Sequence, residues 1–86
     1  MDELSKPGAA LDDDASVEMI RVWIASRKLH CSIKVGMYEE SSEIREQKAW
    51  GIIMADVDRH VASALESGYG MDQQSVLLEI TSAYRV

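Results

Sequence analysis

The chain lacks a long apolar segment. Its longest apolar runs, residues 22–25 and 52–55, hold four residues each, whereas a membrane-spanning helix needs about 18 or more. Residues 1–15 are acidic where a secretory signal is basic, and they contain no sustained apolar stretch. We therefore expect no membrane-spanning helix and a cytoplasmic location.

Cysteine and proline each occur once among the 86 residues. Cys31 has no partner for an internal disulfide, which agrees with a reducing compartment, and free cysteine is most often a small core residue. Pro7 lies in residues 1–15, next to an acidic cluster at residues 12–14. We interpret residues 1–15 as a disordered acidic N-terminal arm, with a tail for a basic partner as the alternative, and residues 16–86 as a single α+β domain.

Basic residues are also scarce, with nine Lys and Arg against fifteen Asp and Glu, for a net charge of −6. Residues 1–16 carry five of the acids and one base, which is −4, so the remaining seventy residues carry only −2. No basic stripe is available to neutralise phosphates. We expect the chain to bind neither nucleic acid nor an anionic membrane surface.

The sequence contains no glycine-rich phosphate loop, Cys-x-x-Cys pair, zinc-binding helix or nucleophile elbow. His30 and Cys31 are neighbours in a predicted strand, so they point to opposite faces and cannot ligate one metal together. We predict no metal site and no cofactor.

Two stretches with a period of two, residues 17–25 and 29–35, predict a β-hairpin. Two registers keep the apolar residues of both strands on one face. A two-residue loop at residues 27–28 requires positive φ angles there and sets Arg21 opposite Lys34. A four-residue loop at residues 25–28 avoids both costs and is the register that we predict. It pairs Ile24 with Leu29, Val22 with Cys31, Ile20 with Ile33, and Trp23 with His30.

Residues 47–68 show a helical period, with an apolar stripe that predicts a core-facing helix ending at Gly68 as a left-handed cap. The stripe consists of Trp50, Ile53, Met54, Val57, Val61, Ala64 and Leu65. Residues 37–47 are predicted to form a loop with at most one helical turn. Asp72 is the predicted N-cap of a last helix.

The resulting order is β-β-α-α, an α+β fold in which two helices cover one face of an antiparallel hairpin. A lone two-stranded sheet is marginal and has two open edges. Its uncovered face presents the candidate interface, Met19, Arg21 and Trp23. We therefore expect a homodimer, formed either by joining hairpin edges or by burying the outer faces against each other.

One polar cluster could support chemistry. Asp56 and His60 lie one helical turn apart, so the carboxylate could orient the imidazole, and Arg59 beside them could hold an anion. His30 from the hairpin could join them. The competing interpretation is an ordinary surface contact.

Two segments resemble a family of small, uncharacterised bacterial proteins classed as a domain of unknown function. They are RVWIA at residues 21–25 with LHCS at 29–32, and AWGI at 49–52 with RHVA at 59–62. The resemblance implies a compact cytoplasmic domain and no particular activity, substrate or cofactor. The leading hypothesis is a small non-enzymatic module for protein–protein interaction or structure. The alternative is an enzyme or small-ligand-binding domain that uses Asp56, Arg59 and His60.

Overall fold

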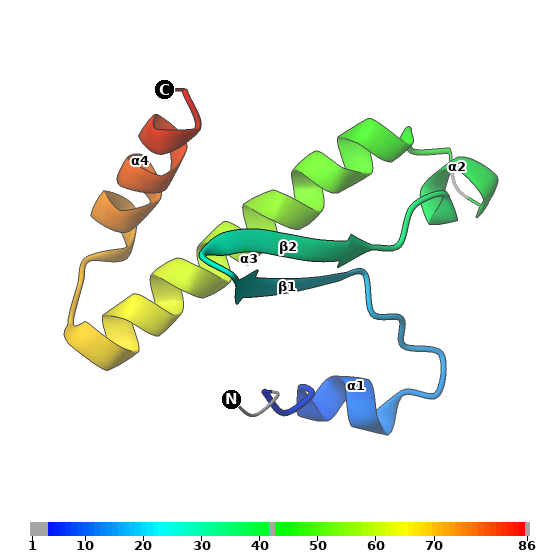
Figure 1. Cartoon of the computed structure of the whole chain (residues 1–86), viewed down its shortest axis with the longest axis horizontal. Coiled ribbons are helices and arrows are strands. Elements are labelled where there is room, and N and C mark those ends of the chain that lie inside the picture. The colour runs from blue at the N-terminus through cyan, green and yellow to red at the C-terminus, as the bar shows by residue number, and fades with distance from the viewer. Residues whose placement is uncertain (1–3, 42, 86) are drawn as a thin grey trace. The chain divides into compact units, whose positions relative to one another are not determined.

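The computed structural model describes residues 4–41 and 43–85, and it confirms the α+β class. Its helices and strands occur in the order α1 (Gly8–Asp12), β1 (Ile20–Ala25), β2 (Lys28–Ile33), α2 (Met37–Ser41), α3 (Glu46–Tyr69) and α4 (Gln73–Tyr84) (Figure 1). The predicted order β-β-α-α is not confirmed, because α1 precedes the strands. The short helix α2 lies within residues 37–47, where the prediction allowed one helical turn. Each of these helices has five residues, too few for a hydrophobic period to be recognised.

The chain divides into two compact units, Met1–Met37 and Tyr38–Val86. The first contains α1 and the hairpin, and the second contains α3 and α4. The expectation that the two helices cover one face of the hairpin stays a prediction.

The hairpin has the predicted register, with Val22 opposite Cys31 and Trp23 opposite His30. The predicted four-residue loop was wrong, since Ala25 also pairs with Lys28 and leaves a two-residue turn. Ser26 and Arg27 form this turn with φ angles of 51° and 63°, and positive φ at both central residues marks a type I′ turn. The additional ladder pair offsets the cost of the left-handed residues.

One face of the hairpin is entirely apolar and largely exposed. The exposed fraction is 52% at Val22, 73% at Ile24, 63% at Leu29 and 48% at Ile33. Cys31 is exposed as well, so its assignment to the core was wrong. A two-stranded ribbon provides no second layer of its own to bury such a face.

Helix α3 extends one residue beyond the predicted start and one beyond the predicted end. Gly68 lies inside the helix, and the left-handed cap is Gly70, whose φ is 68°. The backbone N–H of Gly70 donates to the carbonyl oxygen of Glu66 at 2.9 Å. Although α3 has 24 residues, neither it nor any other helix in the described part of the chain is long and apolar enough to cross a membrane.

Replacing each of the two glycines at this helix end with alanine is expected to change the free energy of unfolding in opposite directions. Apart from the adjacent residues and the backbone of the helix itself, no atom lies within 4 Å of a Cβ built at either position, so only backbone conformation differs. Gly70→Ala should lower the free energy of unfolding by about 1 kcal/mol because L-residues are strained at positive φ. Gly68→Ala should raise it by about 0.5–1 kcal/mol because alanine favours the helix interior. Urea denaturation followed by circular dichroism measures both, and equal effects would contradict the assigned cap.

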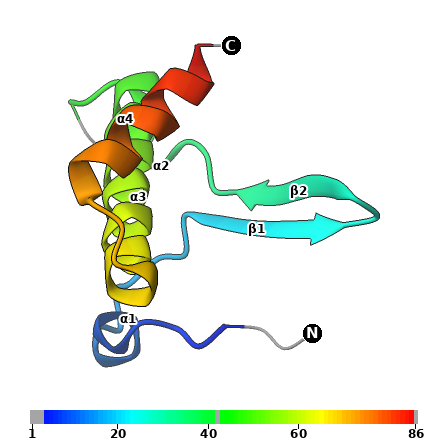
Figure 2. The ribbon, with the colours of Figure 1, turned by 90° about the vertical axis from the view of Figure 1, so that its left-hand side faces the viewer.

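Helix α4 folds back beside α3 (Figure 2). Side-chain hydrogen bonds join the two helices at both ends of α4. Gln73 Nε2 donates to Glu66 Oε1 at 2.8 Å, and the Tyr84 hydroxyl donates to the carboxylate of Asp58 at 2.7 Å. Between these contacts on α3 lies Ala62, which is completely buried. A small residue there allows the two helix backbones to approach closely.

This packing leaves the apolar stripe of α3 only partly covered. At about 100° per residue, Ala62 lies roughly 120° from the centre of the stripe. Within the stripe, Val57 is 37% exposed and Val61 is 42% exposed. Helix α4 covers the flank of the stripe, and contact between the stripe and the hairpin stays a prediction. Asp72, by contrast, is confirmed as the N-cap of α4, since its carboxylate accepts from Ser75 N at 3.0 Å.

Candidate functional site

The predicted polar cluster lies on the surface of α3. Arg59 Nη1 donates to Asp56 Oδ1 at 2.6 Å, with side chains 65% and 62% exposed. His60 is also exposed. A solvent-exposed ion pair contributes about 0–1 kcal/mol, so this geometry is that of an ordinary surface contact, and use of the cluster as a ligand site stays a prediction.

His30 belongs to the N-terminal unit. Its Nε2 lies 3.1 Å from the carbonyl oxygen of Ala25 on the neighbouring strand. Residues 4–41 and 43–85 contain no group of three or more His, Cys, Asp or Glu residues arranged to hold a metal ion. The contact shown for His30 is the one with the Ala25 carbonyl oxygen in the same hairpin.

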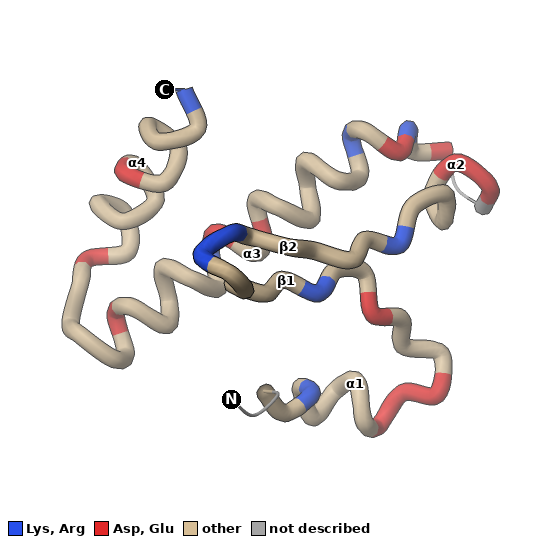
Figure 3. Tube along the Cα trace, in the orientation of Figure 1, with Lys and Arg blue, Asp and Glu red and all other residues tan. Residues whose placement is uncertain are grey.

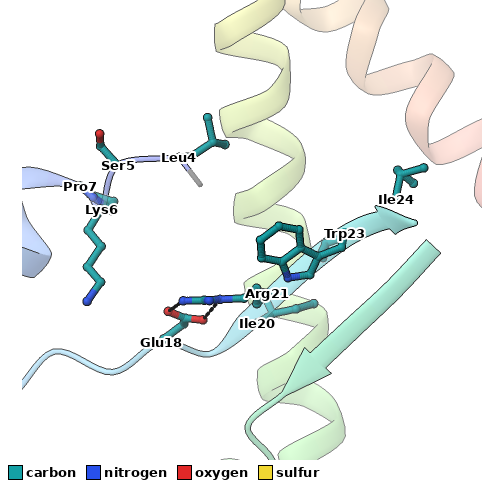
Figure 4. A pocket seen from close by; sticks show the side chains of 10 residues that line it. Leu4, Ser5, Lys6, Pro7, Glu18, Ile20, Arg21, Trp23 and Ile24 are labelled. Carbon is teal, nitrogen blue, oxygen red and sulfur yellow. Dashed lines mark hydrogen bonds and ion pairs between the residues drawn. The ribbon is translucent and has the colours of Figure 1, made fainter. Parts of the chain in front are cut away.

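Two members of the predicted interface, Arg21 and Trp23, line an open pocket of about 680 Å³ beside β1 (Figure 4). Residues 4–7 form its other wall. Trp23 is 43% exposed. Met19 is half-buried and precedes β1, where its carbonyl oxygen accepts a hydrogen bond from Lys34 N at 2.9 Å.

Arg21 is held in place by Glu18. Its Nε and Nη2 atoms donate to the two carboxylate oxygens at 2.7 and 3.0 Å, forming a bidentate pair. The hydrogen bond from Arg21 lowers the pKa of Glu18. The pair neutralises the cationic charge on β1, whereas the turn and the far end of β2 keep basic residues (Figure 3).

The pocket follows the open edge of β1. Five consecutive residues, 20–24, line it, although side chains of alternate residues point to opposite faces of a strand. A pocket lined by both sets must extend along the strand edge between the two faces.

Glu46 is a structural residue that the sequence pattern did not reveal. Its Oε1 accepts from the backbone N–H of Tyr38 at 3.0 Å, and its Oε2 accepts from Trp50 Nε1 at 2.8 Å. Glu39 Oε1 in turn accepts from the backbone N–H of Glu46 at 3.1 Å. The two glutamates thus cap each other's helices and connect α2 to α3. A capping signal seven residues apart lies outside the usual local motif.

A second open groove, about 550 Å³ in volume, lies between α3 and α4. It is lined mainly by apolar side chains and by the acidic residues Asp72 and Glu79. Ser75 also lines the groove, and its hydroxyl donates to Asp72 Oδ2 at 3.1 Å as part of the cap of α4. The lining residues include no histidine, lysine or cysteine that would suggest catalysis.

The Tyr84–Asp58 bond predicts a loss of stability at alkaline pH. Donation to the Asp58 carboxylate raises the pKa of Tyr84 above the usual value of about 10. The stabilisation is complete below the unfolded-state pKa and is lost as pH rises through the folded-state pKa. Tyr84→Phe should therefore remove the part of the unfolding profile that changes above about pH 10. Denaturation of both chains across this pH range measures the effect, and superimposable pH profiles would refute it.

These features define a small α+β domain with a β-hairpin unit, a helical unit and no recognisable catalytic constellation among its described residues. The family model Domain of unknown function (DUF5076) matches residues 3–86, and the chain belongs to this family, as the sequence resemblance indicated. The search of curated proteins gave no match.

A similar fold occurs in the solved structure of a "putative pyruvate dehydrogenase from the photosynthetic bacterium Rhodopseudomonas palustrus CGA009". The two chains are 14% identical with a TM-score of 0.64, and the alignment covers 98% of this chain and 89% of the other. At this identity the likeness establishes the fold alone. The dehydrogenase activity in the name of that protein is not carried over to this chain.

Proposed function

We propose that this chain is a cytoplasmic homodimerisation module with a non-enzymatic role in protein–protein interaction or structure. The observation that carries the proposal is the hairpin of the N-terminal unit, which has only two strands and carries exposed apolar side chains on both of them. The single cysteine agrees with a reducing compartment.

Most of the large hydrophobic side chains are exposed. Only Ala49 and Ala62 are buried among the hydrophobic residues of the described chain. Large hydrophobic side chains are exposed on both strands of the hairpin and, in the other unit, on α3, and exposed apolar surface marks interaction sites. The exposed residues on these elements include Val22, Trp23, Ile24, Leu29, Ile33, Ile52, Val57 and Val61.

Replacing Trp23 with alanine tests the proposal. Trp23 is the largest side chain of the predicted interface, and tryptophans at interface centres contribute about 2 kcal/mol or more. The dissociation constant of the dimer should rise by about tenfold or more, as measured by sedimentation equilibrium. Tyr69→Ala is the matched control, because this aromatic residue is 78% exposed at the end of α3. Equal dissociation constants for Trp23→Ala and the unchanged chain would contradict the role of this face.

A further inference from the structure

We propose that two copies join through the outer edge of β1, with Val22 on the two-fold axis, to form a continuous four-stranded antiparallel sheet in the order β2-β1-β1-β2. This inference rests on the proposed homodimer and specifies the surface through which it forms.

The hydrogen-bond pattern of the hairpin shows which backbone groups face outward. Lys34 N donates to Met19 O at 2.9 Å, so residues 19 and 34 form a hydrogen-bonded pair. Such pairs alternate along an antiparallel ladder. Counting in steps of two makes Arg21–Ser32, Trp23–His30 and Ala25–Lys28 the remaining hydrogen-bonded pairs. The backbone N–H and C=O groups of Ile20, Val22 and Ile24 therefore point away from β2.

These outward groups complement a second copy of themselves. With Val22 opposite the partner's Val22, Ile20 lies opposite the partner's Ile24, and all outward groups from residues 20 to 24 find partners. This gives about six new backbone hydrogen bonds. The apolar faces of the two hairpins then become one continuous apolar face.

The same register also gives a favourable pairing on the other face. Arg21 lies opposite the partner's Trp23 in a pair without hydrogen bonds, where side chains approach most closely. A guanidinium over an indole ring is a favourable cation–π contact. A register centred on Arg21 would instead oppose two arginines, and one centred on Trp23 would place Ile20 opposite the turn residue Ser26.

The edge of β2 is less suited to this pairing. The equivalent arrangement, centred on Cys31, sets Lys28 opposite the partner's Lys34 twice, and directly opposed like charges are destabilising. Lysines on a strand edge are a common protection against strand addition. On β1 the one basic residue, Arg21, is neutralised by Glu18 at 2.7 Å.

The open pocket lies where the proposed partner strand would sit. It follows the edge of β1, is lined by all residues from 20 to 24, and has a volume of about 680 Å³. Figure 4 shows the Glu18–Arg21 pair and Trp23 at this strand. The occupant predicted by this shape and charge is β1 of a second copy.

Cysteine cross-linking tests this arrangement directly. In Val22→Cys with Cys31→Ser, the two introduced thiols meet on the two-fold axis, where the Cα atoms of a hydrogen-bonded pair are about 5.5 Å apart. That distance matches the usual range of about 4.4–6.8 Å for a disulfide. Mild oxidation of the full chain should give a covalent dimer at least about tenfold faster than oxidation of the control, Ile24→Cys with Cys31→Ser. In this control the paired cysteines are offset by four residues, about 14 Å.

The outcomes separate the two proposals. Fast cross-linking at position 22, slow cross-linking at 24, and slow cross-linking of the unchanged chain through Cys31 support the β1 edge. A dimer in which position 22 reacts no faster than position 24, or in which Cys31 reacts fastest, overturns the β1 edge and leaves the homodimer. A monomeric unchanged chain in sedimentation equilibrium overturns both. Circular dichroism of each variant establishes that the fold is retained.

Discussion

Val22→Pro is expected to convert the dimer into a monomer while the hairpin stays intact. Proline lacks the backbone N–H, and at Val22 that group points away from β2, so the ladder within the hairpin loses nothing. In the proposed sheet each copy donates this N–H across the two-fold axis. One substitution therefore removes two hydrogen bonds, each contributing about 0.5–1.5 kcal/mol, and places two rings against each other. We expect the dissociation constant to rise by about 100-fold, or about 3 kcal/mol.

Cys31→Pro is the matched control on the opposite edge. By the same alternation the N–H of Cys31 points away from β1, and proline is tolerated on strand edges that face solvent. This variant should keep the dissociation constant within about threefold of the unchanged chain, well under 1 kcal/mol. The two variants are compared by sedimentation equilibrium. A dimer lost in Cys31→Pro and retained in Val22→Pro would assign the interface to β2.

Ala62→Leu is expected to destabilise the helical unit strongly. Ala62 is completely buried, and it lies between Asp58 and Glu66, the two α3 residues that bond to α4. Three additional carbons at this point force the helices apart, and overpacking of this kind costs about 1–3 kcal/mol. Helix propensity does not confound the change, because leucine is nearly as favourable in a helix as alanine.

Ala64→Leu provides the control two residues further along α3. Ala64 is exposed, so the same carbons enter solvent and the free energy of unfolding should change by less than about 0.5 kcal/mol. Thermal unfolding measures both variants, and amide hydrogen exchange in α4 localises the effect. If the two substitutions are equally destabilising, the close α3–α4 contact at Ala62 is wrong.

The hairpin register could be predicted because only a few pairings keep the apolar residues on one face, and charge repulsion between Arg21 and Lys34 disfavoured one of them. The turn could not be predicted in the same way. Ser26 and Arg27 adopt positive φ angles, which neither residue type favours. The ladder pair between Ala25 and Lys28 stabilises a turn whose local sequence argues against it.

For the helices too, a repeated sequence pattern was predictive, whereas contacts between particular residues were not. A stripe repeated over several turns predicted most of α3, and the Asp72 cap of α4 followed from residue type. The choice of Gly70 over Gly68 depends on where the last helical hydrogen bonds form, which a pattern of two nearby glycines leaves open. The Glu46–Trp50 contact and the paired caps of α2 and α3 required the folded geometry.

The candidate sites were predicted unevenly. Trp23 and Arg21 were predicted to form an interface because they alternate onto the sheet face opposite the apolar one, and the structure adds that both line a pocket beside β1. Asp56 and Arg59 were correctly placed as neighbours on a helix face. Spacing along a helix could not reveal that both side chains of this pair are more than 60% exposed.

The molecular mass of the unchanged chain in solution tests the central claim most directly. Multi-angle light scattering after size-exclusion chromatography, at tens of micromolar chain, should give about 19 kDa, which is twice the 9.6 kDa of one chain. A mass of 9.6 kDa at that concentration would contradict the proposed homodimer and, with it, the pairing of two β1 edges.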